Sequence, residues 1–350
     1  EEIRGVDFVA VNTDSQALLN SLAPIKIQIG EKITKGLGAG GDPSVGQEAA
    51  QESRDRIKEV LEGTDMLFIT GGMGGGTCTG AAPVIAEIAK KELGILTIAV
   101  VTKPFLFEGT RRMSKADEGL SRLRQHVDTL IIIPNQRVME VVNSQATLLD
   151  AFKIADSVLI KGTKAMADLI TTPGLINLDF ADIKSIMSNA GSALMGVGEA
   201  EGPDRAQKAV EAAIDSPLVE VNIDGARGVL INITGGPDLT MAEIEESAKT
   251  ITAHVAPDAN VIFGTSINPE LKDKIKVTVI ATGFDPNKNS LYTSYKKPLS
   301  LQKPLLEEST EAPEIKLDTK FKDIMEDQQV PPGIDIEDEF DIPAFLRKNN

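Results

Sequence analysis

The stretch GGMGGGTCTGAAPVIAEIA, residues 71–89, places six glycines among its first ten residues and follows directly on the apolar run DMLFIT at 65–70. An apolar strand, a glycine-rich turn and a helix in this order aim several backbone N–H groups, and the positive end of the helix, at one point. Glycine lets an anion come close to the backbone, and Thr77 and Thr79 can add hydroxyl donors. The stretch therefore predicts a phosphate-binding loop. The alternative is a turn that serves only close packing.

Two well-known phosphate motifs do not explain this loop. The pattern G-x-x-x-x-G-K-[ST] does not occur in the sequence, whereas G-x-G-x-x-G occurs once, as GLGAGG at 36–41. The residues after it, DPSVG, do not read as a helix, so the motif is weak evidence for a dinucleotide site. A nicotinamide-dependent dehydrogenase stays an alternative, which tight binding of NAD would support.

Strands and helices alternate through the first part of the chain. Runs that are apolar at nearly every position predict strands buried on both faces of a parallel sheet, with helices between them. These runs are VDFVAVN (6–12), DMLFIT (65–70), ILTIAVV (95–101) and TLIIIP (129–134). A helical period then continues from 147 to 171, which predicts a long helix.

A second block of the same kind follows. Its strands are predicted at 228–234, 260–266 and 274–282, and its helices at 203–214 and 240–255. The sequence therefore predicts an α/β fold with two domains joined by a central helix. The predicted boundaries are 1–146 for the first domain, 147–173 for the helix and 174–283 for the second domain.

Beyond Gly283 the periodicity stops. Residues 284–335 are rich in Pro, Ser and charged residues, which predicts a disordered linker. Residues 336–350 place Ile342, Phe345 and Leu346 behind an acidic run. This pattern fits either a frayed tail or a short peptide that binds a partner's groove through the three apolar side chains.

Composition excludes several classes of protein. The 350 residues carry a formal net charge of −16, which argues against a nucleic-acid partner. A single cysteine excludes an intramolecular disulfide and a multi-cysteine metal site, and no metal site is predicted. No apolar run approaches the length of a membrane span, so we expect a cytoplasmic protein without direct membrane insertion. The chain opens on EEIRGVDF, without Met, as if a preceding segment were missing.

Motifs spread along the whole chain resemble the tubulin/FtsZ family, whose bacterial members act in cell division. They are AVNTD (10–14), KGLGAGGDP (35–43), the glycine-rich loop, TKPFLFEGTRR (102–112), IIIPN (131–135), LLDAFKIAD (148–156), GLINLDFADI (174–183) and DIPAFLR (341–347). The resemblance implies a Rossmann-like parallel-sheet GTPase domain, a long central helix, a second α/β domain, a disordered linker and a C-terminal peptide.

The resemblance also implies GTP or GDP as the ligand, with Mg²⁺ carried by the nucleotide. A carboxylate suits the guanine edge, because guanine offers N1–H and N2–H₂ as paired donors; the alternative for Asp156 is a solvated helix carboxylate. The implied nucleotide contacts are Gly74, Gly75, Gly76, Thr77, Cys78 and Thr79, a second loop of Gly38, Ala39, Gly40 and Gly41, and Asn12, Asp14, Glu108, Arg112, Asn135 and Asp156.

For hydrolysis the resemblance points to Asn177, Asp179 and Asp182, which would act on the GTP of the next subunit in a head-to-tail filament. It implies a homopolymer in the division ring at mid-cell, and membrane-tethering and regulatory division proteins as partners of the C-terminal peptide. From the residues alone, LDFAD reads as a helix N-cap formed by Asp179 or Asp182. A degenerate relative that acts only as a scaffold is the remaining alternative.

The chain departs from the family pattern at two points. The family's first strand and first phosphate loop are missing, and Cys78 stands where the family has Gly. A glycine in such a turn often has positive φ, which strains other residues, and a helix N-terminus lowers a thiol pKa. We therefore expect Cys78 to weaken GTP binding or to slow hydrolysis. The alternative is a position with negative φ that tolerates a small side chain.

Overall fold

The computed structural model describes residues 5–137, 147–171, 174–176, 178–215, 223 and 225–284. The predicted C-terminal peptide and all but the first residue of the predicted linker lie outside these ranges, as does Asn177. Within them, every helix is too short or too polar to cross a lipid bilayer.

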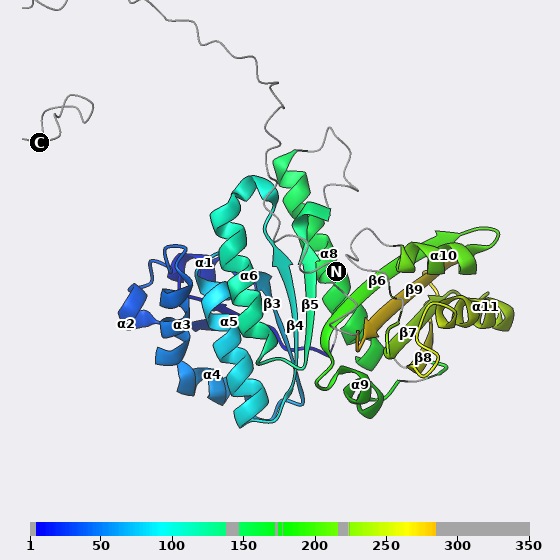
Figure 1. Cartoon of the computed structure of the whole chain (residues 1–350), viewed down its shortest axis with the longest axis horizontal. Coiled ribbons are helices and arrows are strands. Elements are labelled where there is room, and N and C mark those ends of the chain that lie inside the picture. The colour runs from blue at the N-terminus through cyan, green and yellow to red at the C-terminus, as the bar shows by residue number, and fades with distance from the viewer. Residues whose placement is uncertain are drawn as a thin grey trace, which may run out of the picture. The chain divides into compact units, whose positions relative to one another are not determined.

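One mixed sheet of seven strands runs through the described chain, in the order β3-β4-β5-β6-β9-β7-β8 (Figure 1). Neighbours from β3 to β6 are parallel, as are β7 and β8, whereas β9 is antiparallel to both of its neighbours. The strands are β3 (Met66–Gly72), β4 (Leu96–Lys103), β5 (Thr129–Pro134), β6 (Gly191–Glu201), β7 (Gly228–Gly235), β8 (Asn260–Ile267) and β9 (Lys274–Thr282).

The two predicted α/β regions share this sheet. Its halves meet where β5 pairs with β6, from Thr129 opposite Gly191 to Ile131 opposite Ala193. The short pairing is the only ladder in the described chain that joins a strand of the first region to a strand of the second.

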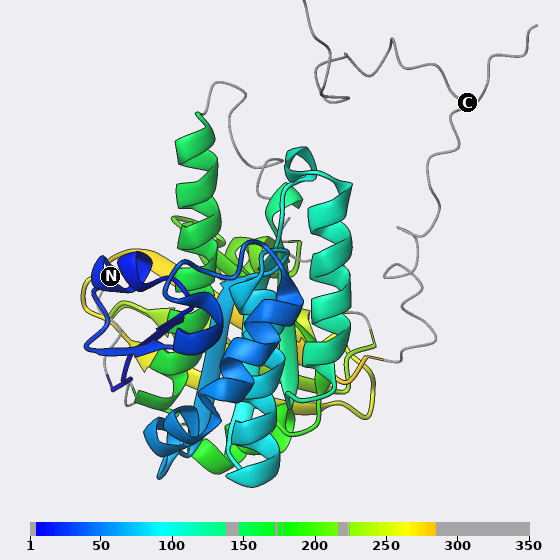
Figure 2. The same ribbon diagram turned by 90° about the vertical axis from the view of Figure 1, so that its left-hand side faces the viewer.

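Helices cover both faces of the first half of the sheet. Figure 2 shows α3 (Pro43–Glu52), α5 (Thr77–Glu87) and α6 (Thr110–Arg124) side by side. Side chains of α5 and α6 pack with Ala99 and Val101 of β4. On the other face, the long helix α8 (Leu148–Thr171) packs against the intervening residues of the same strand. The prediction of parallel strands buried on both faces is confirmed for β4 and β5. It is wrong for the run 6–12, whose strand pairs in a separate sheet and is not buried.

The remaining N-terminal elements form a smaller layer. Strands β1 (Val9–Asn12) and β2 (Ile25–Gln28) pair in parallel as a separate two-stranded sheet. Apolar residues of β2 share a core with α3, with α4 (Arg54–Leu61), with α5 and with the π-helical turn η1 (Ile88–Glu92). Two short helices, α1 (Ser15–Leu19) and α2 (Glu31–Thr34), complete this layer.

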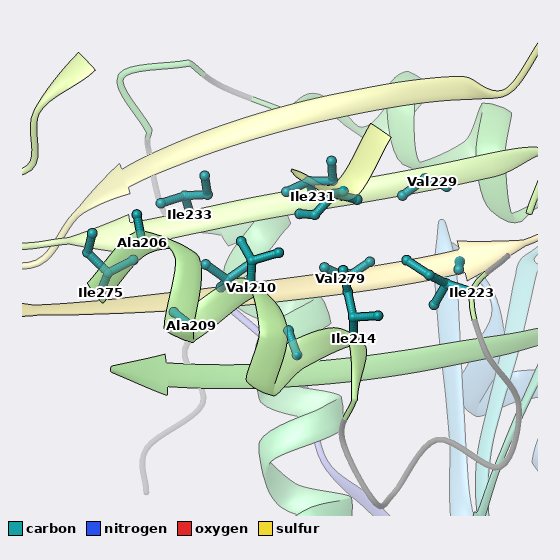
Figure 3. Packing of buried hydrophobic residues seen from close by; sticks show 14 of the residues in the cluster. Ala206, Ala209, Val210, Ile214, Ile223, Val229, Ile231, Ile233, Ile275 and Val279 are labelled. Atoms are coloured by element: carbon teal, nitrogen blue, oxygen red, sulfur yellow. The ribbon is translucent and has the colours of Figure 1, made fainter. Parts of the chain in front are cut away.

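The C-terminal half of the sheet has its own core. Figure 3 shows Ala209 and Val210 of α10 (Arg205–Ile214) packed against β7 and β9. Helix α10 also lies directly on β6, where a Cβ built on Gly196 would be 1.8 Å from the carbonyl oxygen of Ala213. Helices α11 (Met241–Thr252) and α9 (Phe180–Met187) complete this half.

One local prediction is wrong. Helix α3 starts immediately after the loop 36–41, because Asp42 caps it by accepting a hydrogen bond from the backbone N–H of Ser44 at 2.9 Å and Pro43 fits its first turn. In DPSVG, the residues from Pro43 to Gly46 are therefore helical and Asp42 is the N-cap. The loop nevertheless follows α2 and not a strand, so the strand–loop–helix arrangement of a dinucleotide site is not formed.

Candidate functional site

Three neighbouring parallel strands deliver candidate residues to one edge of the sheet. The glycine-rich loop follows β3, the segment with Glu108 and Arg112 follows β4, and Asn135 directly follows β5. Because β3, β4 and β5 are parallel, their carboxyl ends share this edge, which is where open α/β sheets bind ligands.

The glycine-rich loop is fixed by its own contacts. The backbone N–H of Gly74 donates to the hydroxyl of Thr79 at 2.8 Å, which folds the loop back onto the start of α5. Gly74 has φ of +100°, and a Cβ there would be 2.8 Å from the carbonyl oxygen of Arg112. Only glycine fits this position without strain. Thr79 is fully buried, so its hydroxyl supports the loop and is not presented to a ligand.

A second loop lies against the first. The hydroxyls of Thr13 and Thr77 are 2.7 Å apart, and the N–H of Gly38 donates to the carbonyl of Thr13 at 3.2 Å. A Cβ built on Gly76 would be 2.8 Å from the side chain of Ala39. The predicted loops 38–41 and 74–79 are therefore brought together, and Thr13, which joins them, was not predicted from the sequence.

Positive charge gathers at this junction in a chain that is acidic overall. The N-caps of α3 and α5 are adjacent, since a Cβ on Gly76 would be 2.8 Å from the backbone nitrogen of Asp42. The Lys115 ammonium contacts the carbonyl oxygen of Gly41. The α5 N-terminus has no side-chain cap, whereas the Asp42 carboxylate already caps α3, so the start of α5 beside a lysine is the part that suits a polyphosphate anion.

Glu108 and Arg112 form an ion pair at 3.1 Å. Glu108 also accepts the backbone N–H of Phe105 at 2.8 Å, which fixes the turn before α6. Phe105 is fully buried against Ala151 and Ala155 of α8. This contact places the segment after β4 next to the turn of α8 that contains Asp156.

Asn135 and Asp156 fit a base-binding role. Asn135 is 7% exposed, and its Oδ1 atom has no hydrogen-bond partner within the described protein. Burying an unpartnered amide oxygen is unfavourable unless a ligand satisfies it. Asp156 is exposed on α8, so its carboxylate is free to accept hydrogen bonds from a ligand.

The other predicted contacts near β1 have local partners. The Asp14 carboxylate caps α1 by accepting the N–H groups of Gln16 at 2.9 Å and Ala17 at 3.2 Å. The side-chain oxygen of Asn12 accepts the N–H of Asp14 at 3.2 Å. Both side chains therefore shape the turn that carries Thr13 to the loop junction.

The structure contradicts both physical reasons for a harmful Cys78. Cys78 lies inside α5 and is not among the described non-glycine residues with positive φ. Its sulfur packs against the core and lies 3.8 Å from the sulfur of Met73. Burial raises the pKa of the thiol to about 11, whereas the sequence predicted a lowered value. The alternative, negative φ with a tolerated small side chain, describes this position.

The raised pKa predicts an unreactive thiol. Burial favours the neutral form, so the thiolate accumulates only as the pH rises towards about 11. At pH 8 the folded protein should react with iodoacetamide about 100-fold more slowly than a free cysteine, with the rate rising about tenfold per pH unit. Mass spectrometry of the intact protein measures this, with urea-unfolded protein as the control. Equal rates for folded and unfolded protein at pH 8 would contradict the burial.

The acidic segment forms the start of α9. Asp179 is the N-cap, with its Oδ1 accepting the N–H of Asp182 at 2.8 Å while Asp182 accepts the N–H of Asp179 at 3.2 Å. The N-cap reading is therefore correct for Asp179. Asp179 is exposed and Asp182 is half-buried, and each carboxylate has oxygen lone pairs left for a ligand.

The acidic segment lies far from the phosphate loops of the same chain. It follows the carboxyl end of α8, and from Asp156 to Thr171 that helix rises roughly 22 Å at 1.5 Å per residue. Figure 1 shows α9 at the end of the sheet away from the start of α8.

The described residues contain no group of three or more His, Cys, Asp or Glu side chains placed to hold a metal ion.

Known proteins share both the sequence and this fold. Residues 2–143 match the family model described as Tubulin/FtsZ family, GTPase domain, and residues 191–285 match FtsZ family, C-terminal domain. The cell division protein FtsZ of Coxiella burnetii is 56% identical over 285 residues, which are 81% of this chain and 74% of that protein.

Solved structures agree with these matches. The empty FtsZ dimer of M. jannaschii superposes with a TM-score of 0.76 at 50% identity, covering 80% of this chain and 81% of that one. CetZ2 of Haloferax volcanii, a GTPγS-bound protofilament, shares the fold with a TM-score of 0.67 at 19% identity, covering 80% and 84%. By its sequence, its two matched domains and its fold, the chain belongs to the FtsZ family of tubulin-like GTPases.

Proposed function

We propose that this GTPase assembles head to tail into filaments of the bacterial division ring at mid-cell, in the cytoplasm, and that each nucleotide site is completed by the neighbouring subunit. The observation that carries the proposal is the separation along α8 between the phosphate loops and the acidic start of α9. One chain cannot bring both to the same nucleotide, whereas a head-to-tail neighbour can. Such a contact does not close on itself and grows a filament. The FtsZ relatives support this proposal.

In this proposal the two loops bind and orient the triphosphate. Backbone N–H groups at the start of α5, with Arg112 and Lys115, offset its negative charge. Asn135 and Asp156 accept hydrogen bonds from the donor edge of guanine. The neighbour's Asp179, Asp182 and Asn177 would orient and polarise the attacking water, which is the main task left to protein side chains in phosphoryl transfer. Mg²⁺ would arrive on the phosphates and offset charge there.

The test is GTP turnover per subunit as a function of protein concentration. A site completed by a neighbour predicts little turnover below a critical concentration and a steep rise above it, in step with light scattering from filaments. Turnover per subunit that does not depend on concentration would contradict the shared site. GTP binding without turnover at any concentration would favour the scaffold alternative.

We further propose that Ile342, Phe345 and Leu346 anchor membrane-tethering and regulatory division proteins. These residues lie outside the described part of the chain, and the proposal rests on their apolar spacing behind an acidic run. Removing residues 336–350 should leave GTP-dependent filament formation unchanged and should remove the capture of those partners. Pull-downs with the full and the shortened chain measure this, and recovery of the same proteins by both would contradict it.

A further inference from the structure

The described residues of the segment that leads into α9 are hydrogen-bonded to the edge of the sheet at Thr265 of β8. The carbonyl oxygen of Thr265 accepts the N–H groups of Leu175 at 2.8 Å and Ile176 at 3.4 Å, and its N–H donates to the carbonyl of Ile176 at 3.1 Å. Both backbone groups of Thr265 therefore point to this segment and away from β7. Thr265 itself is buried, which keeps these hydrogen bonds away from water.

Two glycines allow the segment to lie this close. A Cβ on Gly174 would be 2.5 Å from the carbonyl oxygen of Thr265, which is closer than any real contact. A Cβ on Gly264 would be 2.6 Å from Cδ1 and 2.9 Å from Cγ of Leu178. Leu178 is 5% exposed and directly precedes Asp179. The backbone of β8 thus sets where Leu178 lies, and Leu178 sets where α9 begins.

The capping box of α9 cannot by itself fix where α9 begins relative to the sheet. The reciprocal hydrogen bonds of Asp179 and Asp182 orient the two carboxylates relative to α9. They do not fix the start of α9 relative to the sheet, and a misplacement of about 1 Å can cost about 100-fold in rate. Ile183, Ile186 and Met187 hold the body of α9 against the core of the sheet. The residue before its N-cap, Leu178, is held by β8.

We propose that β8, through Thr265 and Gly264, is the positioning element for the acidic segment, and that it sets the rate of GTP hydrolysis in the adjacent subunit without contacting nucleotide. The inference rests on the proposed function, in which Asp179 and Asp182 act on a neighbour's GTP. Gly264 and Thr265 are positioning residues, because they act only through Leu178 and the segment that contains it.

The first test is Gly264→Ala. The added Cβ must displace Leu178 by about 1 Å to reach an ordinary contact, which moves the start of α9. We expect turnover per subunit in filaments to fall at least tenfold at saturating GTP, while GTP affinity stays within twofold of the parent. Hydrogen exchange of the Asp182 amide, which donates to Asp179, should become faster. A merely destabilised protein would instead lose GTP affinity and turnover together.

The second test is independent of packing. Leu175→Pro removes the N–H that donates to Thr265, and the Leu175 side chain is 76% exposed, so little packing is lost. Leu175→Ala removes the side chain and keeps the N–H, which makes it the matched control. We expect turnover of the proline variant to fall at least fivefold below that of the alanine variant, again with GTP affinity within twofold. If Gly264→Ala does not fold, the comparison of Leu175→Pro with Leu175→Ala tests the positioning role of β8 on its own.

Asp179→Asn in the same assay distinguishes failure of the positioning role of β8 from failure of the proposed site shared between subunits. If it lacks turnover while Gly264→Ala and Leu175→Pro hydrolyse GTP within twofold of their references, the positioning inference is wrong and the shared site stands. If Asp179→Asn itself turns over GTP normally, the proposed catalytic role of Asp179 is wrong. Loss of GTP affinity in a Gly264→Ala variant that keeps the thermal stability of the parent would also overturn the inference, because a positioning element leaves the subunit's own nucleotide site intact.

Discussion

Replacing Asp179 with asparagine should lower GTP turnover in filaments by about 100-fold or more, because the neighbour's carboxylate would no longer orient and polarise the attacking water. GTP affinity of the isolated subunit should stay within twofold. The carboxylate lies beyond the carboxyl end of α8, roughly 22 Å along that helix from the level of Asp156, so we expect it to take no part in binding the subunit's own nucleotide.

Asparagine is the informative substitution because Asp179 has a second task. Its Oδ1 caps α9, and asparagine is an equally good N-cap, whereas alanine is not. Asp179→Asn should therefore keep the thermal stability of the parent, and Asp179→Ala should lose about 1 kcal/mol as well as turnover. Equal turnover defects in the two variants would assign the defect to the charge and not to the cap.

The measurements are steady-state GTP turnover above the critical concentration, GTP affinity by equilibrium titration below it, and thermal unfolding. A tenfold loss of nucleotide affinity in the isolated subunit would contradict the division of labour between neighbours. Turnover within a few-fold of the parent would remove Asp179 from the catalytic group and leave Asp182 and Asn177 as the remaining candidates.

Elements with strong periodicity could be predicted from the sequence. The strands at 129–134 and 274–282 and the long central helix were predicted within one or two residues of their observed bounds. Strand β6 was not, because its glycines and alanines have low β propensity and break the apolar pattern. The structure gives the reason for this composition: α10 lies so close that β6 has no room for larger side chains at Gly196 and Gly198.

The candidate site was partly predictable for a similar reason. The glycine-rich loop after β3 can be recognised in the sequence, because the groups that would bind phosphate belong to consecutive residues. The contact between Thr13 and Thr77 joins residues 64 apart, and the bridge from Ile176 to Thr265 joins two separate regions of the chain. Neither leaves a local pattern. Cys78 was misjudged because its φ depends on where α5 begins, which the run of glycines does not reveal.

Gly46→Ala should weaken GTP binding about tenfold or more, although Gly46 lies in α3 and outside the phosphate loops. A Cβ there would be 2.3 Å from the carbonyl oxygen of Gly76 and 3.1 Å from that of Thr77. Both atoms are backbone, so either the glycine-rich loop or α3 must move. Overpacking of this kind costs about 1–3 kcal/mol, and each 1.4 kcal/mol corresponds to a factor of ten in affinity. The gain in helix propensity from Gly to Ala, about 1 kcal/mol, does not relieve the clash.

The matched control is Gly162→Ala in α8, a helical glycine whose added Cβ would meet only the Met195 side chain, with its terminal methyl at 2.5 Å. That methyl can rotate away, so the control should keep GTP affinity within twofold and gain or keep thermal stability. Equilibrium titration with GTP and thermal unfolding measure both variants. If Gly46→Ala lowers the melting temperature but binds GTP as tightly as the parent, then α3 moves and the loop does not. In that case the close packing of α3 on α5 supports the fold alone, and the phosphate site does not depend on it.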